Sequence, residues 1–121
     1  MAGAERAERL YRLLPAGDWT TALEAGLVPY SDHDRRDAFM HLSTERQVLE
    51  TARRYFSHCK ELLALEINCE AVGSAIRFER APGRSEAFPH LYGQLPVGAV
   101  RHVRGLVRTN AGDFTFDKDV S

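Results

Sequence analysis

The sequence lacks the features that mark several large classes of protein. No apolar run approaches the roughly 20 residues of a membrane-spanning helix, and the N-terminal segment has no apolar core of signal-peptide length. Lysine and arginine total 16 against 17 acidic residues, so the basic excess typical of a dedicated nucleic-acid binder is missing. We therefore expect a cytoplasmic protein that does not enter a membrane and for which nucleic acid is an unlikely partner.

Cysteine and the common catalytic motifs are also scarce. The two cysteines, Cys59 and Cys69, have no metal-binding or redox spacing, so we predict reduced thiols. The alternative is a single disulfide, which requires an oxidising compartment. The sequence contains no H-E-x-x-H, C-x-x-C, G-x-S-x-G, P-loop or G-x-G-x-x-G pattern. We accordingly expect no bound metal and no serine or cysteine nucleophile.

Length and apolar pattern predict one compact α+β domain over residues 1–121. With 44% hydrophobic residues, a chain of this size can bury a core without a metal or a disulfide. The pattern predicts strands at 9–14, 38–43, 61–68, 75–80 and 100–108, and helices at 19–25 and 43–56. We expect a curved, mostly antiparallel sheet with two helices and a core at about 9–108. Residues 109–121 would form an edge strand or a tail.

Local signals place the ends of these elements. Asp18 and Gly26 are typical of the N-cap and C-cap of the first helix. Thr44 and Gln47 form a capping-box pattern at the start of the second helix. The near-continuous apolar residues of 61–68 indicate a strand covered on both faces. The polar segment 30–37 is turn-like, and we expect its carboxylates to be solvated.

Two tripeptides, H-L-S and H-L-Y, carry the chemistry that the rest of the sequence lacks. In an extended chain residues i and i+2 point to one face, so His41 projects with Ser43, and His90 with Tyr92. Each pair offers a ring nitrogen and a hydroxyl, both able to donate or accept. Four such groups in one cleft suit a ligand rich in hydroxyls, amides or phosphate. The structural alternative is a satisfied histidine at a strand end and a serine that caps a helix.

The segment FPHLYGQLP, residues 88–96, predicts one wall of this cleft. Its prolines stiffen the approach to His90, whose imidazole can act as an acid or a base. Phe88 or Tyr92 would stack on a planar group of the ligand. Gly93 either allows a close approach of the ligand or simply makes the loop flexible.

Charged residues near this segment complete the candidate site. Arg77 and Glu79 share one face of the strand at 75–80, so Glu79 is a third catalytic candidate and Arg77 a binding residue. A surface ion pair between them is the alternative. His33, His41 and His90 with an aspartate could in principle bind a metal, but no recognised spacing supports such a site.

Four segments together resemble a known family: DAFMHLSTERQV, LLALEIN, IRFER and FPHLYGQLP. They are similar to small bacterial proteins grouped as domain-of-unknown-function family 952, and the resemblance runs from about residue 10 to residue 106. It implies a compact fold similar to the ADP-ribosyltransferase superfamily, to which this family is thought to be distantly related.

In that superfamily a strand histidine followed two places later by serine or threonine binds NAD. The resemblance implies that His41 contacts the adenosine ribose and that Ser43 helps to hold the nicotinamide amide. Leu42 departs from the pattern, which has glycine there. The late-strand glutamate of the superfamily has no clear equivalent, so His90 or Glu79 would have to serve.

These observations lead to one functional expectation with two alternatives. We expect a small-molecule enzyme with a two-histidine cleft that carries out ADP-ribosyl transfer or hydrolysis on NAD. The alternatives are a metabolic tailoring enzyme that does not use NAD, and a non-catalytic module that binds a nucleotide or metabolite. No feature of the sequence indicates an oligomeric state.

Overall fold

The computed structural model describes residues 8–80, 83 and 85–119, and its main element is a five-stranded antiparallel sheet. The strand order is β10-β9-β5-β1-β4, with β5 in the centre. The strands are β1 (Leu10–Pro15), β4 (Ser43–Thr44), β5 (Leu62–Ile67), β9 (Val100–Arg108) and β10 (Phe114–Asp119). Each ladder of this sheet is antiparallel, in agreement with the expected α+β class.

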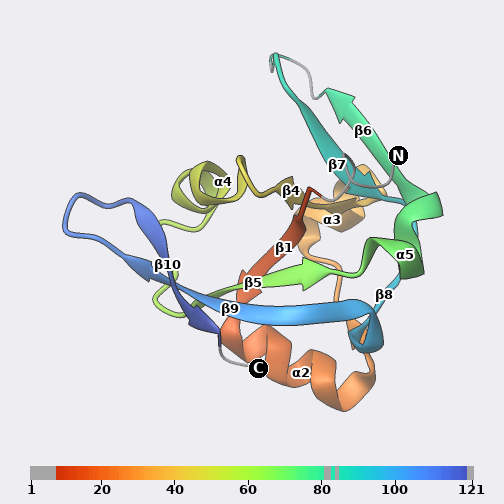
Figure 1. The fold of residues 1–121 in the computed structure, drawn as a ribbon, viewed down its shortest axis with the longest axis horizontal. Helices are drawn as coiled ribbons and strands as arrows, with labels where there is room; N and C mark the ends of the chain where they lie inside the picture. The colour runs from red at the N-terminus through yellow and green to blue at the C-terminus, as the bar shows by residue number, and fades with distance from the viewer. Residues whose placement is uncertain (1–7, 81–82, 84, 120–121) are drawn as a thin grey trace.

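Both faces of the main sheet are covered. Along β5, Leu65 and Ile67 enter one apolar core, while Leu62 and Ala64 enter a second core on the other face. Helix α2 (Ala16–Ala25) and helix α4 (Val48–Tyr55) lie on opposite sides of the sheet (Figure 1). The expectation that this strand is covered on both faces is therefore confirmed, because alternating side chains of one strand supply two cores.

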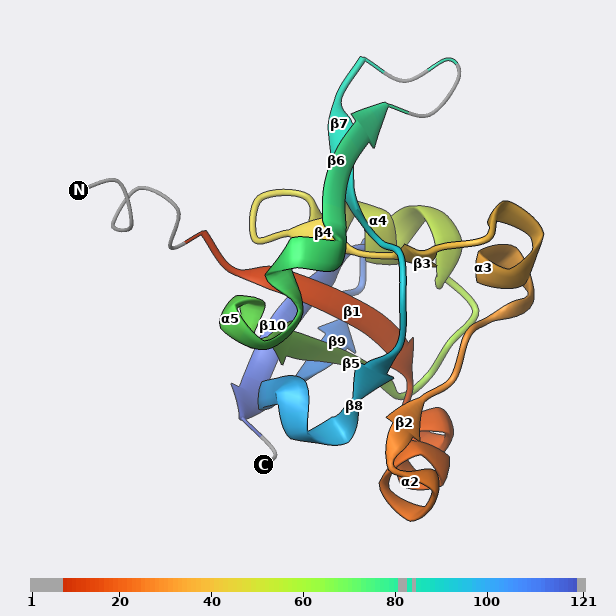
Figure 2. The same cartoon turned by 90° about the vertical axis from the view of Figure 1, so that its right-hand side faces the viewer.

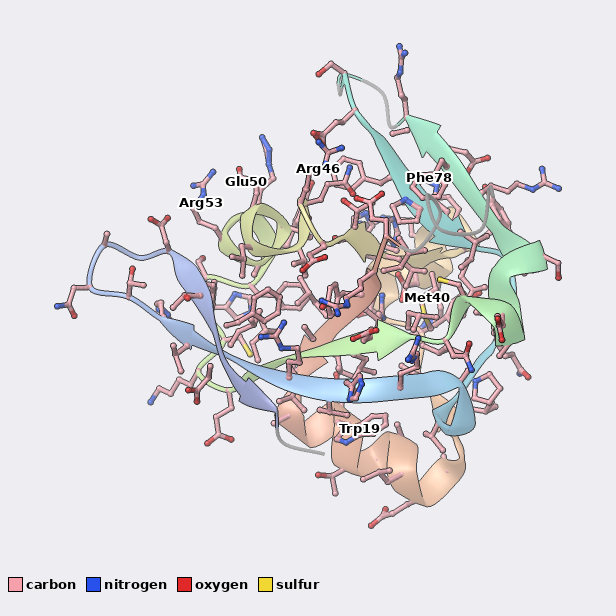
Figure 3. The ribbon with its side chains drawn as sticks, viewed as in Figure 1. Trp19, Met40, Arg46, Glu50, Arg53 and Phe78 are labelled. Atoms are coloured by element: carbon pink, nitrogen blue, oxygen red, sulfur yellow. The ribbon has the colours of Figure 1, made fainter. Side chains whose placement is uncertain are left out.

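Two smaller sheets pack beside the main one. Strands β3 (Met40–His41), β7 (Ala87–Leu91) and β6 (Ile76–Arg80) form one in the order β3-β7-β6, and β2 (Leu27–Val28) pairs with β8 (Leu95–Pro96) in the other. The β6–β7 hairpin projects away from the main sheet (Figures 1 and 2). At the base of this small sheet Met40 lies in the interior, whereas Phe78 lies on the outer part of β6 (Figure 3).

The chain contains short helical segments besides the two predicted helices. Besides α2 and α4, the structure contains α3 (Asp32–Asp37), α5 (Cys69–Val72) and the 3₁₀ turns η1 (Gly73–Ala75) and η2 (Val97–Ala99). The prediction of a turn at 30–37 is wrong. Ser31 and Asp34 form a full capping box, in which each side chain accepts from the backbone N–H of the other.

Two helix starts also differ from the prediction. Helix α2 follows β1 directly with Pro15 as its N-cap, so Asp18 lies in the first turn and caps nothing. Helix α4 begins at Val48 rather than at 43, because residues 43–44 pair with β1 as strand β4. The Gln47 amide oxygen still accepts from the Thr44 N–H at 3.0 Å, which is one half of the predicted capping box. Gly26 ends α2 with φ of 85°, as predicted.

None of the helices in the described part of the chain is both long and apolar enough to cross a bilayer. Cys59 and Cys69 are free. Burial raises the pKa of both thiols, which disfavours the reactive thiolate form.

Candidate functional site

A cleft of about 870 Å³ opens between α3, α4 and the small sheet formed by β3, β7 and β6. This volume is typical of small-molecule sites. Its walls include four aromatic side chains: Phe39, Tyr55, Phe56 and Phe88. In Figure 2, β3 and α4 lie beneath the β6–β7 hairpin, with α3 beyond the end of β3.

The two histidines of the H-L-S and H-L-Y tripeptides meet across β3 and β7. His41 and His90 are direct cross-strand partners, and their ring centroids are 5.7 Å apart. Phe39 stacks on His90 at 3.9 Å and lies 4.7 Å from His41. Because direct partners on an antiparallel pair point to the same face, this register alone brings both imidazoles into the cleft.

The segment that carries His41 and Ser43 changes sheets between these two residues. The Leu42 N–H donates to the Pro89 carbonyl beside the small sheet, whereas Ser43 pairs with Tyr11 of the main sheet. Both His41 and Ser43 line the cleft. The Ser43 side chain is buried, and its hydroxyl donates to Thr51 Oγ1 at 3.0 Å. A ligand that uses this hydroxyl as a donor must therefore compete with Thr51.

Asp34 links Arg12 and His41 in the wall of the cleft. The sequence pattern had predicted a solvated carboxylate at this position, and that prediction is wrong. Its side chain is only 1% exposed. Oδ2 accepts from Arg12 Nη2 at 2.6 Å, and Oδ1 lies 2.6 Å from His41 Nδ1. Burial opposes ionisation, but the hydrogen bonds from His41 and Arg12 outweigh it and hold the pKa of Asp34 well below its usual range. The S-x-x-D pattern beginning at Ser31 is the signal that could have located Asp34.

A second carboxylate engages the other side of the His41 ring. His41 Nε2 lies 2.9 Å from Asp37 Oδ2, and His33 Nε2 lies 3.3 Å from the same oxygen. The His33 and His41 rings are 4.1 Å apart. Burial and the nearby His41 lower the pKa of His33. Because both ring nitrogens of His41 are engaged, a ribose hydroxyl could reach His41 only by displacing Asp37 or Asp34.

His90 is held differently. Its Nδ1 lies 2.8 Å from Glu79 Oε1, and the Tyr92 hydroxyl donates to the same oxygen at 2.6 Å. The hydrogen bond from Tyr92, followed by that from His90, lowers the pKa of Glu79. Glu79 in turn raises the pKa of Tyr92. An ionised carboxylate only accepts, so Nδ1 carries the proton and Nε2 of the neutral ring is an acceptor. Within the described residues no side chain or backbone group hydrogen-bonds Nε2.

The cleft wall contains five of the predicted site residues: His41, Ser43, Glu79, Phe88 and His90. Three others lie outside the wall. Tyr92 reaches the site through Glu79, and the Arg77 guanidinium lies 5.4 Å from the Tyr92 ring centroid. The Gly93 carbonyl accepts from the Tyr30 hydroxyl at 2.7 Å. A Cβ at position 93 would make only an ordinary 3.9 Å contact, so space does not demand glycine there.

Acidic side chains outnumber basic ones in the wall of the cleft. Among the residues that the structure describes, it contains five carboxylates and two arginines: Asp18, Asp32, Asp34, Asp37, Glu79, Arg12 and Arg80. Arg12 is already paired with Asp34. The local field therefore favours a cationic ligand group or a transition state that gains positive charge.

Comparison with known proteins gives a family but no activity. The family model described as a protein of unknown function, DUF952, matches residues 13–103. No curated protein sequence matches the chain. The crystal structure of protein CC0527 from Caulobacter crescentus has 31% sequence identity and a TM-score of 0.80, covering 88% of this chain and 93% of that one. The solution NMR structure of CC0527 gives a TM-score of 0.76 over 87% and 90%.

The family match runs from within β1 to within β9 and so includes β4, β5, the small sheet of β3, β7 and β6, and helices α3 and α4. The similarity to CC0527 extends the same fold over nearly the whole chain. The protein belongs to the DUF952 family.

Proposed function

We propose that the protein is a small-molecule enzyme that cleaves an N-glycosidic bond, with NAD as the first substrate to test. This proposal includes the ADP-ribosyltransferase-like assignment of the fold. The observation that carries it is the His90–Glu79 pair, which faces an acidic cleft with aromatic walls. The reaction would be ADP-ribosyl transfer, or hydrolysis when water is the acceptor.

His90 supplies the proton acceptor. Glu79 fixes the tautomer by accepting from Nδ1, so Nε2 can take a proton from an attacking water or alcohol. In hydrolysis the bond from the anomeric carbon to the nicotinamide nitrogen breaks, and nicotinamide leaves with the bonding electron pair. A water oxygen then bonds to the anomeric carbon, and its proton passes to His90. The products are ADP-ribose, nicotinamide and one proton.

The charge of the cleft supports this class of reaction. The nicotinamide ring of NAD is cationic, and the sugar gains positive charge in an oxocarbenium-like transition state. The Glu79 carboxylate stabilises that charge, while Phe39 and Phe88 line the same wall with aromatic rings that suit a cationic ring. The acidic wall stabilises the anionic diphosphate of NAD less than the cationic ring. We assign the exposed Arg80 as the residue that contacts the diphosphate.

Two alternatives have observations of their own. The excess of carboxylates equally suits a tailoring enzyme that acts on another cationic metabolite. A non-catalytic binding module is supported by the burial of His90, which is 5% exposed beneath Phe39, and by the engagement of both His41 nitrogens.

Chromatography of NAD incubated with the protein tests the proposal. We expect nicotinamide release by wild type and by Arg101→Ala, an exposed residue of β9 outside the cleft. Release should fall about 100-fold or more in His90→Ala and in Glu79→Gln, the typical contribution of a general base. Glu79→Gln is included because Glu79 is partly exposed, so this variant is the more certain to fold.

Thermal shift distinguishes the alternatives. A cationic metabolite that stabilises wild type and is consumed, with NAD inert, would favour the tailoring enzyme. Stabilisation by NAD or a metabolite without any product would favour the binding module. If NAD, ADP-ribose and nicotinamide all leave the melting temperature unchanged at millimolar concentration, the NAD proposal is refuted.

A further inference from the structure

Three side chains of types that can bind metal ions lie together in the wall of the cleft. His33 and Asp37 lie four residues apart on one face of α3, and His41 follows on β3. Their nearest donor atoms, one from each side chain, all lie within 4.8 Å of one another. The structure thus brings together two imidazoles and one carboxylate, a donor set that metal ions such as Zn²⁺ use.

The distances match those around a bound ion. Zinc bonds to histidine nitrogen and carboxylate oxygen are about 2.0–2.2 Å long, which places neighbouring donors about 3.0–3.5 Å apart. Asp37 Oδ2 lies 2.9 Å from His41 Nε2 and 3.3 Å from His33 Nε2. Two of the three donor pairs are therefore already near the spacing of a coordination sphere.

The buried Asp34 carboxylate holds the His41 ring through the ring nitrogen that faces away from Asp37. Metal-binding histidines characteristically donate their other ring N–H to a carboxylate, which fixes the ring and its tautomer. His41 Nδ1 lies 2.6 Å from Asp34 Oδ1. Asp34 is itself held by Arg12 and by the backbone N–H of Ser31. This arrangement holds the His41 ring with Nε2 2.9 Å from Asp37 Oδ2.

We propose that His33, Asp37 and His41 bind one divalent transition-metal ion of the Zn²⁺ class, with Asp34 as the positioning residue for His41. The nitrogen donors disfavour Mg²⁺ and Ca²⁺, which prefer oxygen ligands. Three protein ligands leave a coordination position for water or a ligand, and all three residues line the cleft.

This proposal goes beyond the proposed function and does not depend on it. The ion would bind at His41, whereas the proton acceptor of the proposed reaction is His90, whose ring centroid is 5.7 Å away. Metal binding is measured without any nucleotide, and nicotinamide release is measured in EDTA. The failure of one result therefore leaves the other intact.

Titration of the untagged, EDTA-dialysed protein with Co²⁺, followed by its visible absorbance, tests the site. We expect one Co²⁺ per chain, displaced by Zn²⁺ and unaffected by excess Mg²⁺. The affinity should fall more than about 100-fold in His33→Ala and in Asp37→Asn, since loss of even a supporting group costs 10–100-fold. His33 and Asp37 have side chains 46% and 37% exposed, so circular dichroism should show both variants folded.

His58→Ala is the matched control, because His58 is an exposed histidine outside the cleft. It should bind Co²⁺ as wild type does. The proposal is overturned if folded His33→Ala binds as tightly as wild type, if His58→Ala loses binding equally, or if wild type shows no stoichiometric site. In that case Asp37 is simply a hydrogen-bond acceptor shared by two imidazoles.

Discussion

Replacing Asp34 with asparagine tests whether the buried Arg12–Asp34 pair holds one wall of the cleft. The two side chains are 8% and 1% exposed, and Asp34 accepts hydrogen bonds from Arg12, Ser31 and His41. Asparagine keeps the shape but removes the charge, so Arg12 becomes a buried cation without its partner. Breaking a buried pair in this way costs about 3–5 kcal/mol of the free energy of unfolding.

Urea and thermal unfolding in EDTA measure this cost. For a chain of 121 residues, 1 kcal/mol corresponds to about 4 °C, so the melting temperature should fall by about 12–20 °C. Asp32→Asn is the matched control on the same helix. Asp32 is 92% exposed and its ion pair with Arg35 lies at the surface, so this change should cost less than about 0.5 kcal/mol.

A double-mutant cycle with Arg12→Met separates the pair from the other contacts of Asp34. The double variant should lose less stability than the sum of the single variants, by more than about 1 kcal/mol. Equal losses for Asp34→Asn and Asp32→Asn, or strict additivity in the cycle, would refute the reasoning.

Three further predictions concern groups outside this pair. Hydrogen bonds from Tyr92 and the adjacent imidazole lower the pKa of Glu79 in the folded protein, so the stability that this carboxylate contributes is present above its unfolded pKa of about 4.3 and is lost as pH falls below that value. Carboxylate NMR of the folded protein should show that Tyr92→Phe raises the pKa of Glu79; an unchanged folded-state pKa contradicts the prediction. Urea unfolding should show that Gly26→Ala lowers the free energy of unfolding by about 1 kcal/mol, because Gly26 has a φ of 85° that alanine adopts only with strain. Gly17→Ala, at a position on α2 with open space for a Cβ, should raise the free energy of unfolding by up to about 1 kcal/mol; equal effects of the two changes contradict this. Tyr11→Phe should leave stability unchanged or higher, because the buried Tyr11 hydroxyl has no partner among the described residues; a loss above about 1 kcal/mol contradicts this.

Much of the fold could be predicted because its signals are local. The apolar run of β5 indicated a strand covered on both faces, and Gly26 marked the end of α2. The error at α3 was also local: its capping box is visible at Ser31 and Asp34, but the charged composition of the segment was interpreted as a turn. Short-range patterns therefore suffice for most elements, provided that caps are given more weight than polarity.

Five of the residues that the sequence marked as site candidates line the cleft, but their contacts with one another and with the rest of the chain were not predicted. The i, i+2 rule grouped His41 with Ser43 and His90 with Tyr92; in the structure both histidines line the cleft and Tyr92 lies outside its wall. Nothing in the sequence paired the two histidines across β3 and β7. Ser43 was expected to offer a hydroxyl to the ligand, and the change of sheet at Leu42 instead directs its hydroxyl to Thr51. Strand register and sheet membership depend on packing of the whole chain, which no tripeptide encodes.

By itself the sequence determined the α+β class, strands β1, β5, β6 and β9, helices α2 and α4, and the two tripeptides whose histidines line the cleft. The tertiary structure decided which charges are buried and which groups meet. Arg12 and Asp34 are 22 residues apart in the chain, and they pair only after β1 and α3 pack together. The meeting of His33, Asp37 and His41 likewise requires α3 to fold against β3. Local patterns depend on neighbouring residues, whereas long-range pairs form only where burial and hydrogen bonding repay the loss of chain entropy.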